Sequence, residues 1–216
     1  MLMDLHQISP KRILVINTFG IGDVLFTTPF ISSLKLNFPD SFVGYVGNRR
    51  TATLLEQNPD INRVYVYERD EFKNIYHQSK WKFLDKFKQS LREIKEGKYD
   101  IVFDFSLNRT MNFLTKWIGI QHRVGLNYKG RMPYSTVKIP FDGFEHKHVA
   151  EYYLDILTSM GLQPADVGLK LGVSLKDQEW ADCFLEEAGC HKHDEFIGII
   201  PGAGESWGSQ ARFRRW

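Results

Sequence analysis

The sequence predicts an α/β fold, with a Rossmann-like parallel sheet and helices on both faces, and three observations lead to this class. Residues 13–16 form an unbroken apolar run that enters a Gly-rich turn and then an amphipathic segment. A buried parallel strand meets its following helix in this way. Strand-like and helix-like segments then alternate along the chain. The 216 residues are 43% hydrophobic and 25% charged, which is typical of an ordinary globular protein.

The first half of the chain continues this order. A helix is expected over residues 24–38, with a kink or restart at Pro29, because proline breaks a regular helix interior. Residues 41–47 and 64–67 are expected to be the second and third strands, with a short helix from residue 48 between them. Strand and helix in alternation predict right-handed crossovers and a parallel sheet.

Residues 72–98 are the most basic piece and are expected to form one helix. Its apolar residues repeat at spacings of three and four and predict one buried stripe: Trp81, Leu84, Phe87, Leu91 and Ile94. The favoured interpretation is a helix packed on the sheet with a solvated lysine face. The alternative is a face that rests on anionic lipid head groups. Nucleic acid is disfavoured because the aromatic residues are assigned to the buried stripe.

The middle of the chain carries two more strand candidates. Residues 99–105 are a buried strand that ends near Asp104, and residues 122–126 are a short strand with a glycine exit. Residues 127–144 are expected to be an irregular binding loop, because they are rich in Gly and Pro and carry Lys129 and Arg131.

Two further helices are expected toward the end of the chain. Residues 149–160 form a helix that Gly161 ends, and residues 175–188 form one that Ser174 caps. The stretch between them, residues 162–173, is expected to be a linker.

Residues 196–201 repeat the opening pattern, an apolar run that enters a Gly-rich turn. A lone strand cannot bury its apolar faces, and a second domain of ordinary size takes roughly 100–150 residues. We therefore expect three regions: a Rossmann-like domain over 1–162, a linker and helix over 163–194, and the start of a truncated second domain over 195–216.

The first glycine turn has two functional interpretations. Gly20 and Gly22 could open a dinucleotide fingerprint, but Leu25 holds the place of the third glycine. Asp23 also places a carboxylate where a pyrophosphate would sit, so NAD or FAD binding is disfavoured. Asp23 itself is either a helix cap or an exposed carboxylate that accepts a proton at the mouth of a cleft.

Composition and residue spacing disfavour several other classes of protein. The net charge of +2 indicates no polyanionic partner, and no apolar stretch is long enough for a membrane span. The stretch formed by the first ten residues is too short and too polar for a signal peptide. Two cysteines are typical of a protein from a reducing compartment, so a cytoplasmic protein is expected. The His-x-His pairs at 146/148 and 191/193 lack a third ligand at a useful spacing, so no metal site is expected.

The opening residues, an apolar strand followed by Gly-x-Gly-Asp at 20–23 and then by Thr27-Thr28-Pro29, resemble glycosyltransferase family 9, the lipopolysaccharide heptosyltransferases. The resemblance implies the N-terminal domain of a GT-B glycosyltransferase. It implies heptose transfer from ADP-heptose to a lipid-linked core acceptor with inversion, and no cofactor besides this nucleotide-sugar substrate. Asp23 maps onto the proposed family base. A peripheral contact with the cytoplasmic face of the inner membrane is part of the same expectation.

The resemblance also implies binding residues. Gly22 and Thr27 in the first turn, Asp104 at the end of its strand and Arg109 in the following loop are expected to bind the acceptor. The alternative for Asp104 is a charge or cap that orders the next loop, and the alternative for Arg109 is a place on the surface. The Pro-Gly-Ala and Arg-x-Trp motifs near the end of the chain imply three donor-binding residues: Gly202, Arg214 and Trp216. Arg214 stands where the family usually has lysine, and arginine keeps the charge but changes its shape.

A second function stays open at this point. The missing second domain favours a catalytically inactive half-protein that binds the acceptor or a membrane surface.

Overall fold

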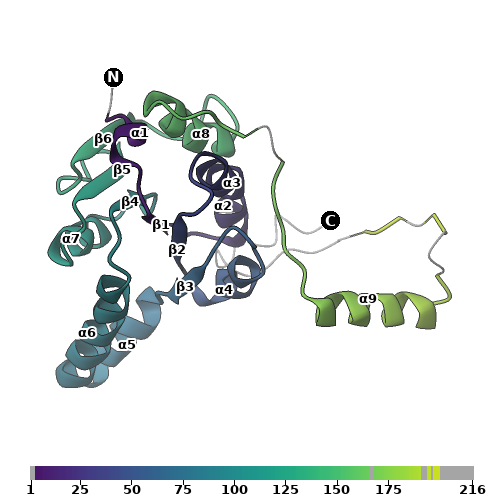
Figure 1. Ribbon diagram of the computed structural model, residues 1–216. Coiled ribbons are helices and arrows are strands. Elements are labelled where there is room, and N and C mark those ends of the chain that lie inside the picture. Colours follow the sequence, from purple (N-terminus) through teal and green to yellow (C-terminus); the bar gives the residue numbers. More distant parts are fainter. Residues whose placement is uncertain (1–2, 166–167, 191–193, 196, 200–216) are drawn as a thin grey trace. The chain divides into compact units, whose positions relative to one another are not determined.

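The computed structural model describes residues 3–165, 168–190, 194–195 and 197–199 (Figure 1). The chain divides into two compact units, Met1–Val173 and Ser174–Trp216. The first unit holds all strands found in the described residues and is built around one sheet.

The sheet has six strands in the order β3-β2-β1-β4-β5-β6, and every neighbouring pair is parallel. The strands are β1 (Arg12–Ile16), β2 (Phe42–Gly47), β3 (Arg63–Val66), β4 (Ile101–Asp104), β5 (His122–Tyr128) and β6 (Val137–Phe141). This order confirms the predicted Rossmann-like parallel sheet.

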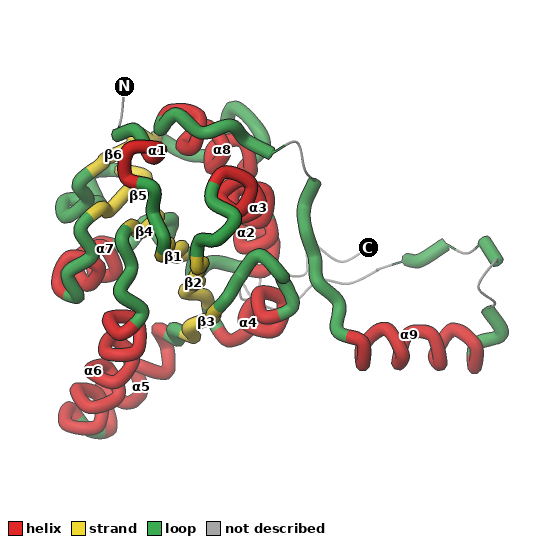
Figure 2. Tube along the Cα trace, in the orientation of Figure 1, coloured by secondary structure: helices red, strands yellow, loops and turns green. Residues whose placement is uncertain are grey.

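Helices cover both faces of the sheet (Figure 2). The helices of the first unit are α1 (Leu5–Ile8), α2 (Ile21–Leu25), α3 (Thr28–Asn37), α4 (Arg49–Glu56), α5 (Arg69–Gln78), α6 (Lys80–Glu96), α7 (Arg109–Trp117) and α8 (Val149–Ser159). One apolar core joins the sheet to α3, α4 and α8, and the second core joins it to α6 and α7.

The central strand β1 contributes to both cores because its side chains alternate. Ile13 and Val15 belong to the core under α3 and α8, and Leu14 and Ile16 belong to the core under α6 and α7. All four are at most 2% exposed. The unbroken apolar run is therefore the signature of a strand buried on both faces.

The predicted helix over 24–38 breaks where Pro29 required it. It becomes α2 and α3, and Pro29 lies in the first turn of α3, where its missing N–H costs nothing.

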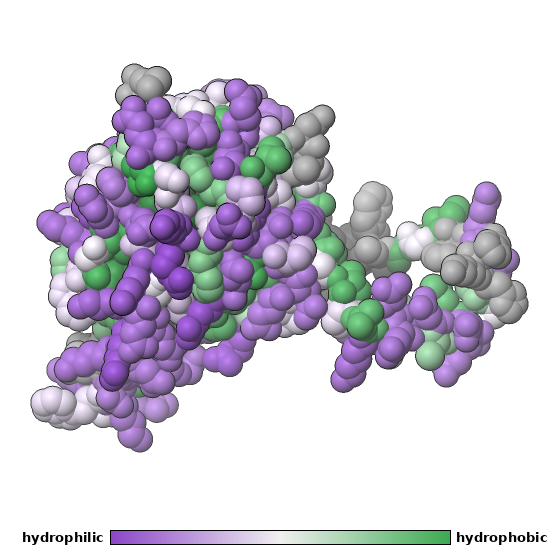
Figure 3. Space-filling model, in the orientation of Figure 1, coloured by the Kyte–Doolittle hydropathy of each residue, from purple (hydrophilic) through white to green (hydrophobic). Residues whose placement is uncertain are grey.

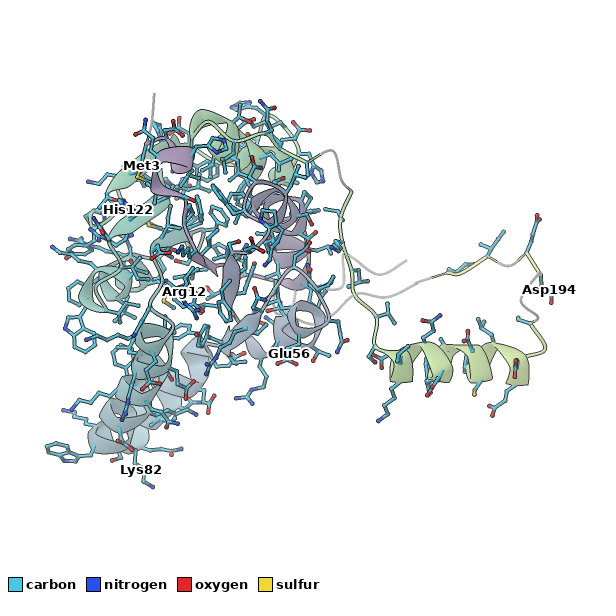
Figure 4. The ribbon with its side chains drawn as sticks, viewed as in Figure 1. Met3, Arg12, Glu56, Lys82, His122 and Asp194 are labelled. Carbon is cyan, nitrogen blue, oxygen red and sulfur yellow. The ribbon has the colours of Figure 1, made fainter. Side chains whose placement is uncertain are left out.

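The single helix expected over 72–98 is wrong in one respect, because Ser79 divides it into α5 and α6. Ser79 has extended backbone angles, and its side chain accepts from the N–H of Lys82. Trp81 is 83% exposed and does not belong to the buried stripe, whereas Leu91 is buried. Figure 4 shows Lys82 at the end of the α5–α6 pair that is distant from the sheet, and at this end α6 has no strand to cover.

The irregular loop expected over 127–144 contains a strand that was not predicted. Residues of β6 pair with β5 in parallel, from Val124 opposite Val137 to Tyr128 opposite Phe141. Pro140 is tolerated because β6 is an edge strand.

The segment predicted as a linker packs onto the first unit. The N–H of Ala165 donates to Ser33 Oγ at 2.8 Å, and the N–H of Lys170 donates to Thr28 Oγ1 at 2.9 Å. Lys170 also pairs with Asp60 at 2.7 Å. The first compact unit thus extends to Val173.

In the second unit, α9 (Leu175–Glu187) is capped by Ser174 as predicted. Trp180 stacks on Phe184 with 5.4 Å between ring centroids. None of the described helices is both long and apolar enough to cross a membrane.

A pair of glycine substitutions tests the packing of the sheet. A Cβ at Gly44 would lie 2.0 Å from Tyr99 Oη, which shares a 3.0 Å hydrogen bond with Tyr65 Oη. Gly44→Ala should therefore lower the free energy of unfolding by about 1–3 kcal/mol. A Cβ at Gly22 meets no atom within 4 Å, so Gly22→Ala should be neutral or stabilise by up to about 1 kcal/mol. Urea denaturation measures both, and equal effects would contradict the packing described.

Candidate functional site

A cleft lies at the carboxyl edge of the sheet, next to the junction of β1 and β4. The chain proceeds from β1 to one side of the sheet and returns with β4 on the other, so the loops after these two strands diverge. Ligands of open α/β sheets bind at such a switch point. The first residues of β1 and β5, Arg12 and His122, mark the opposite edge (Figure 4).

The cleft has a volume of about 500 Å³, within the range of small-molecule sites. Its lining comes from the segments after five strands: Thr18, Phe19, Asn48, Arg50, Tyr67, Glu68, Ser106, Leu107, Asn108, Tyr128 and Arg131. Two arginines, several amides and hydroxyls, and one carboxylate therefore face the same space.

Two asparagines hold the β1–α2 turn in place. Asn17 is completely buried; its Oδ1 accepts from the N–H of Phe19 at 3.0 Å, and its Nδ2 donates to the carbonyl of Asp23 at 3.2 Å. Asn48, at the end of β2, donates to the carbonyl oxygens of Thr18 and Phe19. The turn is thus fixed by side chains from two adjacent strand ends.

Asp23 is the third residue of α2 and is half-buried. Its Oδ2 accepts from the N–H of Gly20 at 3.0 Å, which is the capping interaction. No residue in the described part of the chain forms a hydrogen bond with Oδ1. One carboxylate oxygen therefore orients the side chain. Asp23 adjoins the cleft through Gly20 and Phe19 but is not among its lining residues.

Two buried tyrosines stand near Asp23. Burial raises the pKa of Tyr45 above its ordinary value, and the negative charge of Asp23 raises it further. Burial and then Asp23 also raise the pKa of Tyr153, against a hydrogen bond with Asn17 that lowers it. Both hydroxyls therefore remain protonated and neutral at physiological pH.

Of the other residues predicted in this turn, Thr27 is completely buried. Its Oγ1 donates to the carbonyl of Val24 at 2.7 Å and lies 2.9 Å from Tyr45 Oη. Gly22 is exposed, with nothing close to its Cβ position.

Asp104, the last residue of β4, lies under the cleft and not in its wall. It is completely buried, and its Oδ1 accepts from the N–H of Ser106 at 3.1 Å and from Ser106 Oγ at 2.6 Å. Its Oδ2 is buried and accepts no hydrogen bond from the described residues. Burial raises the pKa of Asp104 to about 6, although the Ser106 and Asn112 groups act in the opposite direction. Asp104 therefore holds Ser106, which does line the cleft.

Arg109 begins α7 and is exposed, and it is not among the residues that line the cleft. The cations that do line it are Arg50 and Arg131. Arg131 was noted in the sequence as part of the presumed binding loop, and its guanidinium lies 5.6 Å from the Tyr128 ring centroid. Arg50 was missed, although its place just after the capping Asn48 at the end of β2 is a signal that could have found it.

Some of the predicted residues cannot be placed relative to this site, because the structure does not describe them. Gly202, Arg214 and Trp216, predicted to bind the donor, lie outside the described residues, as do His191 and His193. His148 caps α8, because its Nδ1 accepts from the N–H of Ala150 at 3.3 Å.

Comparison with solved structures assigns the fold class first. A glycosyltransferase of family 9 from Veillonella parvula superposes with a TM-score of 0.72 at 24% identity, covering 93% of this chain and 56% of that one. The Escherichia coli heptosyltransferase WaaC with ADP-2-deoxy-2-fluoro heptose superposes with a TM-score of 0.63 at 16% identity, covering 74% and 51%. The chain thus shares the α/β fold of these glycosyltransferase structures.

Sequence comparison narrows the class. Lipopolysaccharide heptosyltransferase 3 of E. coli is 27% identical over 146 residues, which are 65% of this chain and 40% of that protein. The protein of the same description from E. coli strain K12 is 26% identical over 188 residues, 84% and 51% of the two chains. No protein-family profile matches. The chain is thus similar to the lipopolysaccharide heptosyltransferases, the resemblance that its opening motif indicated, and it spans about half the length of the curated relatives it matches.

The buried carboxyl of Asp104 gives a pH-dependent prediction. Because its folded pKa of about 6 exceeds the unfolded value of 3.8, the native state holds an extra proton between these values, and stability falls as pH rises through this window. Asp104→Asn removes this dependence and keeps an oxygen that can accept from Ser106. The free energy of unfolding of the variant, relative to the natural protein, should thus rise by about 2 kcal/mol between pH 4 and pH 7. Urea denaturation across this range tests it, and a constant difference would contradict the buried charge.

Proposed function

We propose that the chain forms the acceptor side of an inverting glycosyltransferase and that Asp23 is its general base. The reaction transfers heptose from ADP-heptose to a hydroxyl of a lipopolysaccharide core acceptor. The observation that carries the proposal is the carboxylate of Asp23, fixed through one oxygen beside the switch-point cleft while the other oxygen has no hydrogen bond within the described residues.

The relatives support the choice of substrates. The curated relatives are lipopolysaccharide heptosyltransferases, and the WaaC structure holds an ADP-linked fluoro-heptose. A nucleotide sugar as donor and a core sugar as acceptor are the partners that this likeness suggests for the present chain.

The proposed step needs one base and one leaving group. Asp23 Oδ1 accepts the proton of the acceptor hydroxyl as its oxygen forms a bond to the anomeric carbon of heptose. The bond from that carbon to the phosphate oxygen breaks, ADP leaves with the electron pair, and the anomeric configuration inverts. The hydrogen bond from the N–H of Gly20 holds the carboxylate in one orientation throughout, which is the positioning that general-base catalysis requires.

The cleft supplies binding groups for the acceptor. Arg50 and Arg131 can each meet a phosphate or carboxylate of the acceptor through two parallel hydrogen bonds. Asn48, Ser106 and Asn108 add uncharged groups suited to sugar hydroxyls. The predicted roles of Gly22, Thr27 and Arg109 in acceptor binding, and of Gly202, Arg214 and Trp216 in donor binding, stay predictions.

Replacing the base tests the proposed reaction. Asp23→Asn keeps an oxygen that can accept from Gly20, so the free energy of unfolding should change by no more than about 1 kcal/mol. Turnover, measured as ADP release in the presence of acceptor, should fall by about 10²–10⁴-fold. Asp40→Asn, in the exposed loop after α3, is the matched control and should leave turnover unchanged. Equal turnover of the Asp23 variant and the natural protein would refute the role.

Arginine substitutions test the acceptor cleft separately. Arg50→Ala and Arg131→Ala should each weaken binding of a phosphorylated heptose acceptor by about tenfold or more, because each removes a charge-assisted hydrogen bond. Arg109→Ala, outside the cleft lining, should have little effect. Calorimetric titration measures all three.

The three affinities together show where the acceptor binds. Loss with Arg109→Ala alone would place the acceptor at the start of α7 and contradict the cleft. Acceptor binding without any ADP release would favour the alternative function, a binding module without transfer activity.

A further inference from the structure

We propose that the outer face of α6, together with the groove between α6 and α7, docks on an anionic phospholipid bilayer. This face lies on the side of the sheet that α6 and α7 cover, and none of its residues lines the cleft. The proposal therefore does not depend on the proposed transfer reaction.

The groove is a hollow of about 560 Å³ between the second half of α6 and the last turn of α7. Its lining is Lys88, Leu91, Arg92, Lys95, Trp117 and Ile118. Every charged residue in it is a cation. Among the described residues no ion pair forms at Lys88 or Lys95, whereas Arg92 pairs with Glu96 at 2.9 Å. Two lysines are thus available to an anionic partner.

The face continues along α6 to an exposed tryptophan. Trp81, Lys88, Arg92 and Lys95 follow one another at seven, four and three residues, so they share one side of the helix. Asp85 and Glu96 are acidic residues on this side, both exposed, and Glu96 is paired with Arg92. Hydrophilic residues dominate the surface over α5 and α6 (Figure 3).

Two tryptophans border this row of cations, and both are open to solvent. Trp81 is 83% exposed and Trp117, at the end of α7, is 61% exposed. Tryptophan is favoured at the level of lipid head groups, because its ring is apolar and its N–H is polar. Cations between the two rings meet the lipid phosphates at the same level.

The dimensions favour a bilayer over a single phosphate or a nucleic acid. The row from Trp81 to Lys95 extends about 21 Å along the helix, which is longer than one phosphate group can occupy. The two indoles stand on different helices at opposite ends of this surface, so they make no continuous platform on which bases could stack. A lipid surface satisfies all of these groups together.

Vesicle sedimentation with the full 216-residue chain tests the proposal. The chain should bind phosphatidylcholine vesicles that contain phosphatidylglycerol, release them as salt is raised, and ignore vesicles of phosphatidylcholine alone. Lys88→Gln with Lys95→Gln should weaken binding by about 25-fold, at about fivefold per lysine. Lys138→Gln with Lys176→Gln changes the net charge equally at two exposed sites elsewhere and should keep the affinity.

A tryptophan substitution and two competing ligands test whether a lipid surface occupies this face. Trp81→Ala should weaken vesicle binding by severalfold and leave the unfolding transition unchanged, because the ring is exposed. No vesicle binding, or equal losses for both lysine pairs, would overturn the proposal. So would full displacement of vesicles by inorganic phosphate at constant ionic strength. Tighter binding of a single-stranded RNA, lost with the same lysines, would also overturn it and assign the face to nucleic acid.

Discussion

The pairing of β1 with β4 is the constraint on which the rest of the structure depends. Backbone partners run from Ile13 opposite Ile101 to Ile16 opposite Asp104, so both strands end at the same level. The chain proceeds from β1 to β2 on one side and comes back as β4 on the other. The two following loops must diverge, and this leaves a cleft between them. Because β1 is buried on both faces, its end is a rigid support for the turn that carries Asp23.

The two carboxylates after these strands have opposite environments. Asp104 is sealed under the cleft, where burial raises its pKa to about 6 and its function is to hold Ser106. Asp23 is half-buried and anchored to the N–H of Gly20. Both aspartates follow an apolar strand in the sequence, and only the packing distinguishes Asp104, which orders a loop, from Asp23, the proposed base. The helix-cap and general-base interpretations of Asp23 are compatible, because each uses a different oxygen.

The fold class was predictable from the sequence because buried parallel strands are apolar throughout. The break at Pro29 was predictable for an equally local reason, since proline cannot occupy a regular helix interior. The break at Ser79 was not predictable, because a serine within a helical pattern does not by itself end the helix. Here the Ser79 side chain caps the next helix. The strand β6 was missed because an edge strand tolerates Pro140 and exposed residues.

The candidate site was predictable only in part. The Gly-x-Gly-Asp motif located the turn and Asp23, and Asp104 was correctly placed at the end of its strand. Arg50 was missed. Its place just after Asn48 is a local signal, but only the adjacency of β2 and β1 brings it to the cleft. Thr27 and Asp104 were expected to bind the acceptor, but packing buries both completely, and no local pattern indicates this.

We propose that the acceptor sugar binds in the switch-point cleft. Amide chemical-shift mapping during titration with a phosphorylated heptose tests this binding site most directly. We expect shifts at the ends of the strands, in Thr18, Asn48, Ser106 and Asn108, and in Arg131. Shifts confined to the opposite edge of the sheet, near Arg12 and His122, would contradict this binding site. So would the absence of any shift at the highest concentration of the sugar.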